Sequence, residues 1–204
     1  MSRLRRKDEH LLAASLVERA GSDFSEISLI HNCLPESKLE SVSLETDYMG
    51  RTYRSPLFIN ALTGGTALAA KINAQLAMVA RCCGLPLAVG SQMIALEHQN
   101  HLTRRSFRIT RSINRSGAIW ANIGAYATPA MALEAVNMLN ADALQVHLNS
   151  AQEINMPEGE RDFKGTLERI KTLAEECPVP VIIKEVGFGI AAEEARLLAR
   201  CGVK

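Results

Sequence analysis

The amino-acid sequence predicts an α/β protein built on parallel β-strands, and three observations carry this prediction. From residue 56 onward, short apolar segments alternate with amphipathic helical segments, as in repeated βα units. Helix start and stop signals separate the two kinds of segment. Polar side chains recur at the ends of the apolar segments, about one βα unit apart. A doubly wound sheet and a (β/α)8 barrel both have this pattern.

The first 55 residues lack the alternation. Residues 6–22 have the apolar spacing of a helix, and residues 42–56 have the pattern of a short hairpin that turns at Gly50. No low-complexity linker follows them. We predict that residues 1–55 form an N-terminal helix and hairpin cap, and that residues 56–204 form the βα units of a barrel.

Five βα units follow one another along the chain. The predicted strands are residues 56–65, 85–92, 117–126, 144–150 and 179–189; the predicted helices are 67–84, 129–141, 163–177 and 191–202, with 96–109 as the return segment after the second strand. Gly84 is placed to end its helix in a left-handed conformation, and Thr128 with Pro129 forms an N-cap and first-turn pair. A closed barrel needs eight units, so we expect the first five units of a longer (β/α)8 barrel.

Composition and charge exclude several classes of function. The 204 residues are 47% apolar, and 23 basic residues nearly balance 22 acidic ones for a net charge of +1. This balance argues against a nucleic-acid partner held by a broad positive field. No apolar run reaches the ~18 residues of a membrane span, and five scattered cysteines fit reduced thiols. We therefore expect a cytoplasmic protein with no membrane partner.

Polar residues at the strand ends define a candidate site. They are Thr63, Ser91, Asn122, His147 with Asn149, and Lys184. In parallel α/β folds the carboxyl ends of the strands share one face, where ligands bind. Taken singly, Thr63, Ser91 and Asn122 could serve turns and loops, and His147 could be a hydrogen-bonded core residue. Lys184 needs an anionic partner, because burying an unpaired ammonium costs several kcal/mol.

The fourth predicted strand leads into further polar groups. Its apolar positions Leu144, Val146 and Leu148 alternate with Gln145, His147 and Asn149. One face of the strand is therefore apolar, and the other would point into the barrel. Gln152 and Glu153 follow in an expected loop at the same mouth. Glu153 could be an ordinary surface acid or a ligand to Mg²⁺, which also takes water and phosphate oxygens.

Two further segments have anion-binding chemistry. The run RLRRKDEH includes Arg6, Lys7 and His10, and suits either a solvated helix end or an arm that clamps phosphates. The TGGT segment at residues 63–66 offers backbone N–H groups near a helix start, which suit a phosphate or the edge of a flat heteroaromatic ring. Neither the dinucleotide fingerprint nor the P-loop is present.

Taken together, these motifs resemble one enzyme family. The segments RKDEH, ALTGGT, VGSQ, ANIGA, QVHLNSAQE with PEGERDF, and VPVIIKEVGFGI occur in this order, as in the type II isopentenyl-diphosphate isomerases. The resemblance covers nearly all of the chain. It implies an FMN-dependent (β/α)8 barrel of isoprenoid biosynthesis, which needs Mg²⁺ and reduced flavin and converts isopentenyl to dimethylallyl diphosphate by a 1,3-proton shift. NADPH would reduce the flavin, and the intact enzyme would be a homo-oligomer, a tetramer or octamer.

The resemblance also implies a role for each matching residue. The substrate-binding residues would be Arg6, Lys7, His10, Ser91, Gln92, Asn149 and Gln152. The FMN-binding residues would be Ala61, Leu62, Thr63, Gly64, Ser91, Asn122 and Lys184. The catalytic residues would be His147, Gln152 and Lys184, with Glu153 as the Mg²⁺ ligand. Reduced flavin carries negative charge near N1, which would give the Lys184 ammonium its anionic partner. Where the family often has arginine after VGSQ, this chain has Met93.

Two alternatives stay open. Another FMN-dependent barrel oxidoreductase, such as a hydroxy-acid oxidase, would share Lys184 and the strand-end layout without needing Lys7 for diphosphate or Glu153 for Mg²⁺. An inactive ligand-binding fragment is the second alternative. The flavin phosphate site of such barrels usually comes from the last βα loops, which five units would lack.

Overall fold

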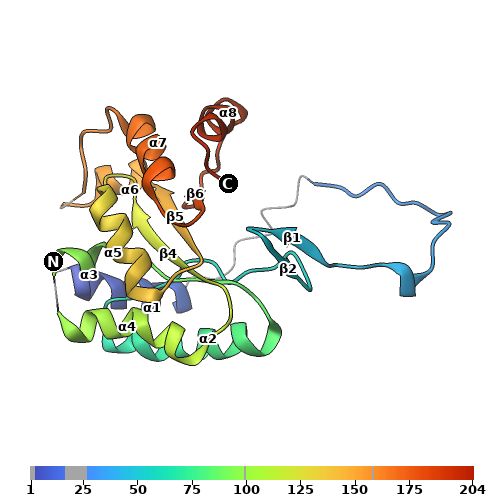
Figure 1. Cartoon of the computed structure of the whole chain (residues 1–204), viewed down its shortest axis with the longest axis horizontal. Helices are drawn as coiled ribbons and strands as arrows, with labels where there is room; N and C mark the ends of the chain where they lie inside the picture. Colours follow the sequence, from blue (N-terminus) through green and yellow to red (C-terminus); the bar gives the residue numbers. More distant parts are fainter. Residues whose placement is uncertain (1–2, 17–26, 99, 158) are drawn as a thin grey trace.

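A computed structural model of the chain describes residues 3–16, 27–98, 100–157 and 159–204. Its main sheet consists of the parallel strands β3 (Leu87–Ala88), β4 (Ile119–Gly124), β5 (Ala143–Leu148) and β6 (Val181–Glu185), paired in chain order (Figure 1). The register sets Asn122 opposite Gln145 and His147 opposite Lys184. The second to fifth predicted strands are therefore present.

The predicted first strand, residues 56–65, is not formed as a strand, so this part of the prediction is wrong. Ile59 alone makes a parallel bridge, to Leu87, with one backbone hydrogen bond on each side, both 2.9 Å long. Directly afterwards the Asn60 side chain accepts the Ala61 N–H at 2.8 Å. This local bond takes up a backbone donor that a longer ladder would need, so regular pairing ends after one residue.

Five helices cover the outer face of the sheet. They are α2 (Ala67–Cys83), α4 (His101–Ile113), α5 (Pro129–Leu139), α7 (Thr166–Glu176) and α8 (Ala192–Arg200). Each packs against the next in this order, and together they form one layer beside the strands (Figure 1). Of the expected return segment, residues 96–109, residues 101–109 belong to α4, and residues 96 and 97 end the short α3 (Met93–Glu97). A doubly wound sheet would carry helices on both faces, so the one-sided layer indicates barrel-like curvature.

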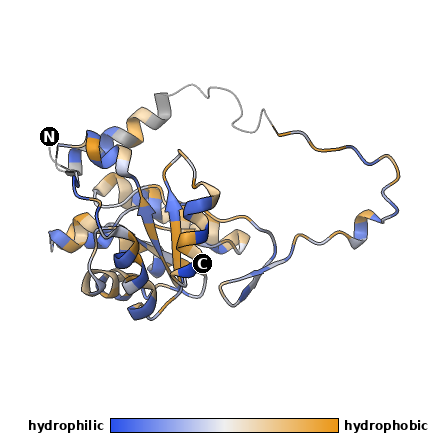
Figure 2. Ribbon diagram, turned by 90° about the horizontal axis from the view of Figure 1, so that it is seen from above, coloured by the Kyte–Doolittle hydropathy of each residue, from blue (hydrophilic) through white to orange (hydrophobic). Residues whose placement is uncertain are grey.

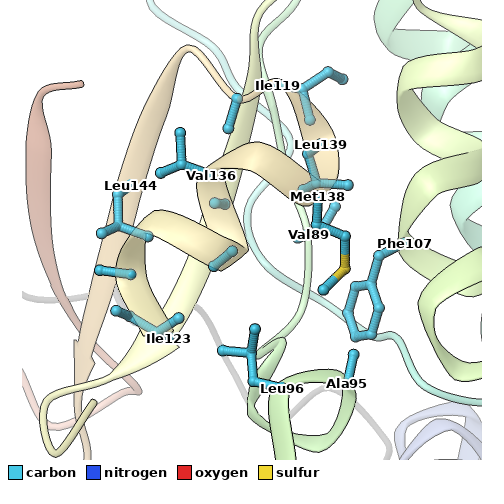
Figure 3. Packing of buried hydrophobic residues seen from close by; sticks show 14 of the residues in the cluster. Val89, Ala95, Leu96, Phe107, Ile119, Ile123, Val136, Met138, Leu139 and Leu144 are labelled. Atoms are coloured by element: carbon cyan, nitrogen blue, oxygen red, sulfur yellow. The ribbon is translucent and has the colours of Figure 1, made fainter. Parts of the chain in front are cut away.

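The main core lies between this helical layer and the outward-facing strand residues (Figure 3). Ile119, Ile123 and Leu144 of the sheet share one apolar cluster with Val136 and Leu139 of α5. All five side chains are at most 5% exposed, and burying each such side chain stabilises the fold by ~1.5–3 kcal/mol. The apolar face predicted for β5 thus packs against the helices.

The helix ends follow the predicted signals. Gly84 ends α2 with a φ of 67°, a left-handed conformation that glycine adopts without steric cost. Thr128 caps α5 by accepting the Met131 N–H, and Pro129 occupies the first turn. The predicted end of α2 and the predicted start of α5 are therefore confirmed.

The hairpin predicted around Gly50 is present as β1 (Thr46–Tyr48) and β2 (Arg51–Tyr53). Met49 and Gly50 both have positive φ, 53° and 72°, as a two-residue type I′ turn requires. Tyr48 packs edge-on against Trp120, with ring centroids 6.0 Å apart. The hairpin therefore lies against the start of β4. The short 3₁₀ helix η1 (Leu39–Ser41) belongs to residues 27–45, an arm that extends away from the body (Figure 1, Figure 2).

Two predictions about the chain as a whole can be compared with the structure. All five cysteines are free thiols, in agreement with the predicted lack of a disulfide frame. Within the described ranges, none of the helices combines the length and the apolar content that a bilayer span requires.

Candidate functional site

A cavity of about 300 Å³ lies at the carboxyl ends of the parallel strands, at the small end of the range for ligand pockets. Most of the site residues predicted from the sequence line it: Lys7, Ala61, Leu62, Thr63, Ser91, Asn122, His147, Asn149, Gln152, Glu153 and Lys184. These residues are far apart in the sequence and are brought to one place by the fold. Their individual roles stay predictions.

Strand register explains why the polar residues converge. The paired layers on the inner face, from the strand starts toward the cavity, are Trp120 with Ala143, Asn122 with Gln145, and His147 with Lys184. Side chains alternate between the two faces of a strand, so every second residue is one step closer to the mouth. The two layers nearer the cavity are polar, and the layer at the strand starts is apolar and packs with Ala88.

His147 is a neutral imidazole at neutral pH. Burial and the positive charges of Lys184 and Lys7 lower its pKa to about 4, from an ordinary value of 6.5. Its Nδ1 atom lies 2.9 Å from Oδ1 of Asn122, which is 2% exposed. At neutral pH, His147 therefore acts in the cavity as a hydrogen-bonding group without a positive charge.

Lys184 carries positive charge into the cavity. Burial lowers its pKa, while the Glu185 carboxylate acts in the opposite direction. The Lys184 Nζ donates to the Glu185 carbonyl at 2.9 Å. The Glu185 carboxylate accepts the backbone N–H groups of Gly187, Phe188 and Gly189, which turns it toward its own loop. Lys184 is only partly buried, so it is less enclosed than the sequence predicted.

The N-terminal helix α1 (Arg3–Leu16) brings a second cation to the cavity. Lys7 Nζ donates to the Ser91 carbonyl at 3.2 Å and lies 6.0 Å from the centroid of the Phe107 ring. The next residue, Asp8, accepts the Thr66 hydroxyl at 2.6 Å, while Thr66 also caps α2. These contacts fix α1 against the residues that form the mouth.

The residues after β5 form a helix, α6 (Ser150–Asn155), where the sequence predicted a loop. The first helical hydrogen bond joins the Glu153 N–H to the Asn149 carbonyl at 2.9 Å. Glu153 is 5% exposed; its Oε1 accepts from Asn149 Nδ2 at 3.2 Å and its Oε2 from the Glu160 N–H at 2.9 Å. A carboxylate offers about four lone-pair sites, so Glu153 retains capacity for a cation.

The donor set around Glu153 decides what kind of metal could bind there. Within the described ranges, no group of three or more His, Cys, Asp or Glu side chains is arranged as a metal site. Gln152 adds an amide oxygen to the same cavity wall. One carboxylate with neutral oxygens suits Mg²⁺, which completes its coordination with water and ligand phosphate.

Two predicted site residues lie outside the cavity. Gln92 is fully buried at 0% exposed; its Nε2 donates to the Ala135 carbonyl at 3.1 Å and its Oε1 accepts the Asn122 N–H at 3.0 Å. It braces β4 from the core side and does not reach the cavity, where it was expected to bind substrate. Gly64 faces Phe107 so closely that a Cβ would lie 1.9 Å from the ring. Its glycine is required for packing, and it does not line the expected flavin site.

Three further groups expected to bind a ligand do not line the cavity in the described part of the chain. The Gly65 N–H, expected to be available to a ligand in the TGGT segment, donates to Ser106 Oγ at 2.7 Å. Arg6 and His10 belong to α1, but their side chains lie outside the described part of the chain. Their expected contact with diphosphate stays a prediction.

Residues that the sequence reasoning missed complete the cavity wall. They are Leu11, Gly90, Met93, Ile94, Tyr126, Met156 and Val186. Gly90 is needed because a Cβ there would lie 2.6 Å from the Thr63 backbone, and a glycine inside the predicted strand 85–92 was the one available signal. The apolar residues other than Met93, whose position the family resemblance had marked, have no such signal, because their sequence pattern is that of ordinary core.

Curated relatives match the chain along its whole length, whereas no family model matches it. The chain is 47% identical over 204 residues to an isopentenyl-diphosphate delta-isomerase of Moorella thermoacetica. It is 44% identical over 205 residues to one of Bacillus pumilus and 46% identical over 205 residues to one of Bacillus cytotoxicus. Each alignment covers 100% of this chain but 57 or 58% of the relative. The chain thus spans a little over half the length of these relatives.

Solved structures of similar fold include mandelate oxidases. One, with benzaldehyde, has a TM-score of 0.58 at 17% identity; another, with an FMN adduct, has a TM-score of 0.57 at 17% identity. Both matches cover 81% of this chain and 51% of the other chain. At this identity the likeness concerns the fold alone, and the described part of the chain has an α/β barrel-like fold.

Proposed function

We propose that the protein containing this chain converts isopentenyl diphosphate to dimethylallyl diphosphate with reduced FMN and Mg²⁺, and that the chain supplies the first βα units of its (β/α)8 barrel. One observation carries the proposal: Lys7, Lys184 and Glu153, from three distant segments, line a single cavity. Lys7 and the Glu153 carboxylate suit a diphosphate with its Mg²⁺ ion, and Lys184 suits an anionic reduced flavin. The 44–47% identity to isopentenyl-diphosphate delta-isomerases over the whole chain supports the reaction.

The diphosphate would bind on the side of the cavity that α1 closes. Lys7 is held there by its hydrogen bond to the Ser91 carbonyl, so its ammonium is positioned before a ligand arrives. Arg6 and His10 of the same helix would add donors. The positive charges that lower the pKa of His147 come from Lys184 and Lys7, so an anion bound near them would raise that pKa again.

The residues present fit a flavin in the same cavity. Ala61, Leu62 and Thr63 provide a wall at the end of the first βα connection, and Asn122 and Lys184 provide polar atoms across from it. Asn122 keeps one amide hydrogen beyond its bond to Gln145. The chemistry that reduced FMN supplies when bound is proton transfer at the substrate carbon atoms. The Lys184 ammonium would favour an anionic cofactor over a neutral one.

The same residues fit a Mg²⁺ ion bound together with the substrate. Glu153 is buried and held by hydrogen bonds to Asn149 Nδ2 and to the Glu160 backbone, so its carboxylate is fixed before metal binding. The preceding residue, Gln152, lines the same cavity. Mg²⁺ at Glu153 would neutralise part of the diphosphate charge while Lys7 orients it.

The remaining residues would position the hydrocarbon end of the substrate and exclude water. Asn149 and Gln152 are hydrogen-bonded to each other at 3.3 Å, which limits the orientations of both amides. His147 is neutral and accepts or donates hydrogen bonds without adding charge. The alkene substrate carries no charge at its reacting carbons, so a neutral, partly buried wall suits it better than an ionised one.

The test is turnover under anaerobic conditions. The protein containing this chain, with FMN, Mg²⁺ and a reductant, should convert isopentenyl diphosphate to dimethylallyl diphosphate without net consumption of electrons. A flavin oxidoreductase would instead turn over a 2-hydroxy acid and pass electrons to an acceptor. Formation of a 2-oxo acid with no isomerised diphosphate would reject the proposal in favour of that alternative.

Matched variants would connect the activity to the cavity. Lys184→Met keeps the length of the side chain and removes its charge, so FMN retention and turnover should both fall by at least about 100-fold, as for lost transition-state charge stabilisation. Lys171→Met removes an exposed charge from α7 and should leave both unchanged. Glu153→Gln should raise the Mg²⁺ concentration needed for half-maximal turnover by roughly tenfold or more.

We further propose that NADPH reduces the flavin, that the intact protein is a tetramer or octamer, and that it acts in the cytoplasm. The first two points follow from the family resemblance alone, and the third follows from the pattern of scattered cysteines. Sedimentation of the intact protein and stopped-flow reduction of bound FMN by NADPH would test the first two directly.

A further inference from the structure

Behind His147, a row of side-chain amides follows the inner face of the sheet. Asn122 Oδ1 lies 2.9 Å from His147 Nδ1, and Asn122 Nδ2 donates to Gln145 Oε1 at 3.2 Å. Gln145 Nε2 in turn donates to Asn60 Oδ1 at 3.4 Å. The same oxygen of Asn60 accepts the Ala61 backbone N–H at 2.8 Å. The row therefore begins at a backbone group and ends at the imidazole.

The Ala61 backbone sets the sense of every bond in this row. A backbone N–H can only donate, so the atom of Asn60 that receives it is the amide oxygen. Gln145 must then turn its NH₂ group to Asn60 and its oxygen to Asn122. Asn122 must likewise turn its NH₂ group to Gln145 and its oxygen to His147. Amide orientation is usually assigned from the surrounding network, and here one unambiguous donor determines the whole network.

We propose that Asn60 and Gln145 are positioning residues that select the Nδ1–H tautomer of His147. Asn122 presents only an acceptor to Nδ1, which favours the tautomer with the hydrogen on Nδ1 and the lone pair on Nε2. The Ile123 backbone also hydrogen-bonds to the ring, so the amide row acts together with this contact. His147 lines the cavity, and the nitrogen left for a cavity ligand is therefore a hydrogen-bond acceptor. Neither Asn60 nor Gln145 was singled out as a site residue from the sequence.

Burial gives this selection its strength. Gln145 and Asn122 are each 2% exposed, so water does not replace a bond that either amide loses on rotation. Reversing the row would place NH₂ against N–H at the Ala61 end, where Asn60 is exposed and water can take up the lost bond, or leave a pair of facing donors or acceptors between buried side chains. A mismatch between the buried groups disfavours the other tautomer by roughly tenfold or more.

The tautomer assignment does not depend on which reaction the protein catalyses. The role of His147 Nε2 toward a ligand, however, rests on the proposed function. In the proposed isomerase, His147 Nε2 would accept a hydrogen bond from the cofactor, the substrate or an ordered water, and would not deliver a proton from that atom. A loss of activity alone would not distinguish these roles. The test is therefore spectroscopic.

The test is long-range ¹H–¹⁵N correlation NMR of the chain labelled with ¹⁵N-histidine, near neutral pH, where His147 is neutral. The spectrum shows which ring nitrogen carries the hydrogen, and His147→Asn identifies the signal among the five histidines. The unchanged chain should show the Nδ1–H pattern for His147. Gln145→Met removes the amide but keeps its length, so Asn122 is free to rotate and the Nε2–H population should rise by roughly tenfold.

Control and rescue variants separate positioning from a general structural effect. Gln75→Met makes the same chemical change on the exposed side of α2 and should leave the His147 signal as it is. Adding Asn122→Asp to Gln145→Met places an atom that can only accept beside Nδ1, so the Nδ1–H pattern should return although the row is cut. A loosened structure would not be rescued by this second change.

Asn60→Ala provides an independent test if Gln145→Met does not fold, because Asn60 is exposed and its loss leaves the core intact. It should shift His147 in the same direction as Gln145→Met, by a smaller factor. An Nε2–H pattern in the unchanged chain, or the unchanged pattern in folded Gln145→Met or Asn60→Ala, would overturn the inference. The expected spectra in a protein without isomerase activity would reject the proposed function and leave the tautomer assignment standing.

Discussion

Lowering the pH from about 6.5 to about 4 should destabilise the fold through His147. The pKa of this imidazole is about 4 in the folded chain and close to the ordinary 6.5 in an unfolded one. As the pH falls through this window, the unfolded state binds a proton that the folded state does not bind, so the free energy of unfolding decreases. At about 1.4 kcal/mol per pKa unit, the loss is about 1.4 kcal/mol at pH 5.5 and about 3 kcal/mol once the pH is below 4.

The assay is urea unfolding at a series of pH values, followed by tryptophan fluorescence. Trp120 is the single tryptophan and is 3% exposed, so unfolding changes its environment. His147→Asn retains a polar side chain but cannot titrate, and the difference between the two chains isolates the His147 contribution from that of the carboxylates. His101→Asn, which removes an exposed imidazole, is the control and should follow the unchanged chain.

The difference curve also tests the physical cause of the low pKa. Burial is the largest cause, and the charges of Lys184 and Lys7 are smaller ones. Lys184→Met should therefore recover only part of the stability lost between pH 6.5 and pH 4. Parallel stability curves for the unchanged chain and His147→Asn would refute the reasoning, and full recovery in Lys184→Met would refute burial as the main cause.

Three other perturbations follow from the packing and can be measured by the same unfolding assay. Gly64→Ala places a Cβ 1.9 Å from the fully buried Phe107 ring and should lower the free energy of unfolding by about 1–3 kcal/mol; adding Phe107→Leu should recover part of it. The Arg111 guanidinium donates to five backbone carbonyls, so Arg111→Lys should cost about 2–3 kcal/mol, and a midpoint equal to that of exposed Arg105→Lys would contradict this role. Thr66→Val removes the cap of α2 and should cost about 1 kcal/mol, whereas Thr66→Ser should not.

Local rules explain why much of the architecture could be predicted from the sequence. The positions of Gly84, Thr128 and the turn at Gly50 depend on residues within one turn of chain, and each takes the predicted conformation. The wrong prediction of a strand at residues 56–65 also has a local cause. An apolar pattern predicts a strand, but the Asn60 side chain takes up the next backbone donor and pairing ends at Ile59.

The sequence by itself determined which residues lie at the strand ends, because the period of two in a strand and the shared direction of parallel strands are properties of the local pattern. Gln92 points into the core instead of the cavity. This direction was decided by tertiary structure, because the Gln92 amide donates a hydrogen bond to a backbone carbonyl of α5. The low pKa of His147 was likewise decided by its burial and, to a smaller degree, by Lys184 and Lys7, which are distant in the chain and close only in the fold. Pleating and capping act between near neighbours, whereas burial and charge depend on every group that the tertiary structure brings together.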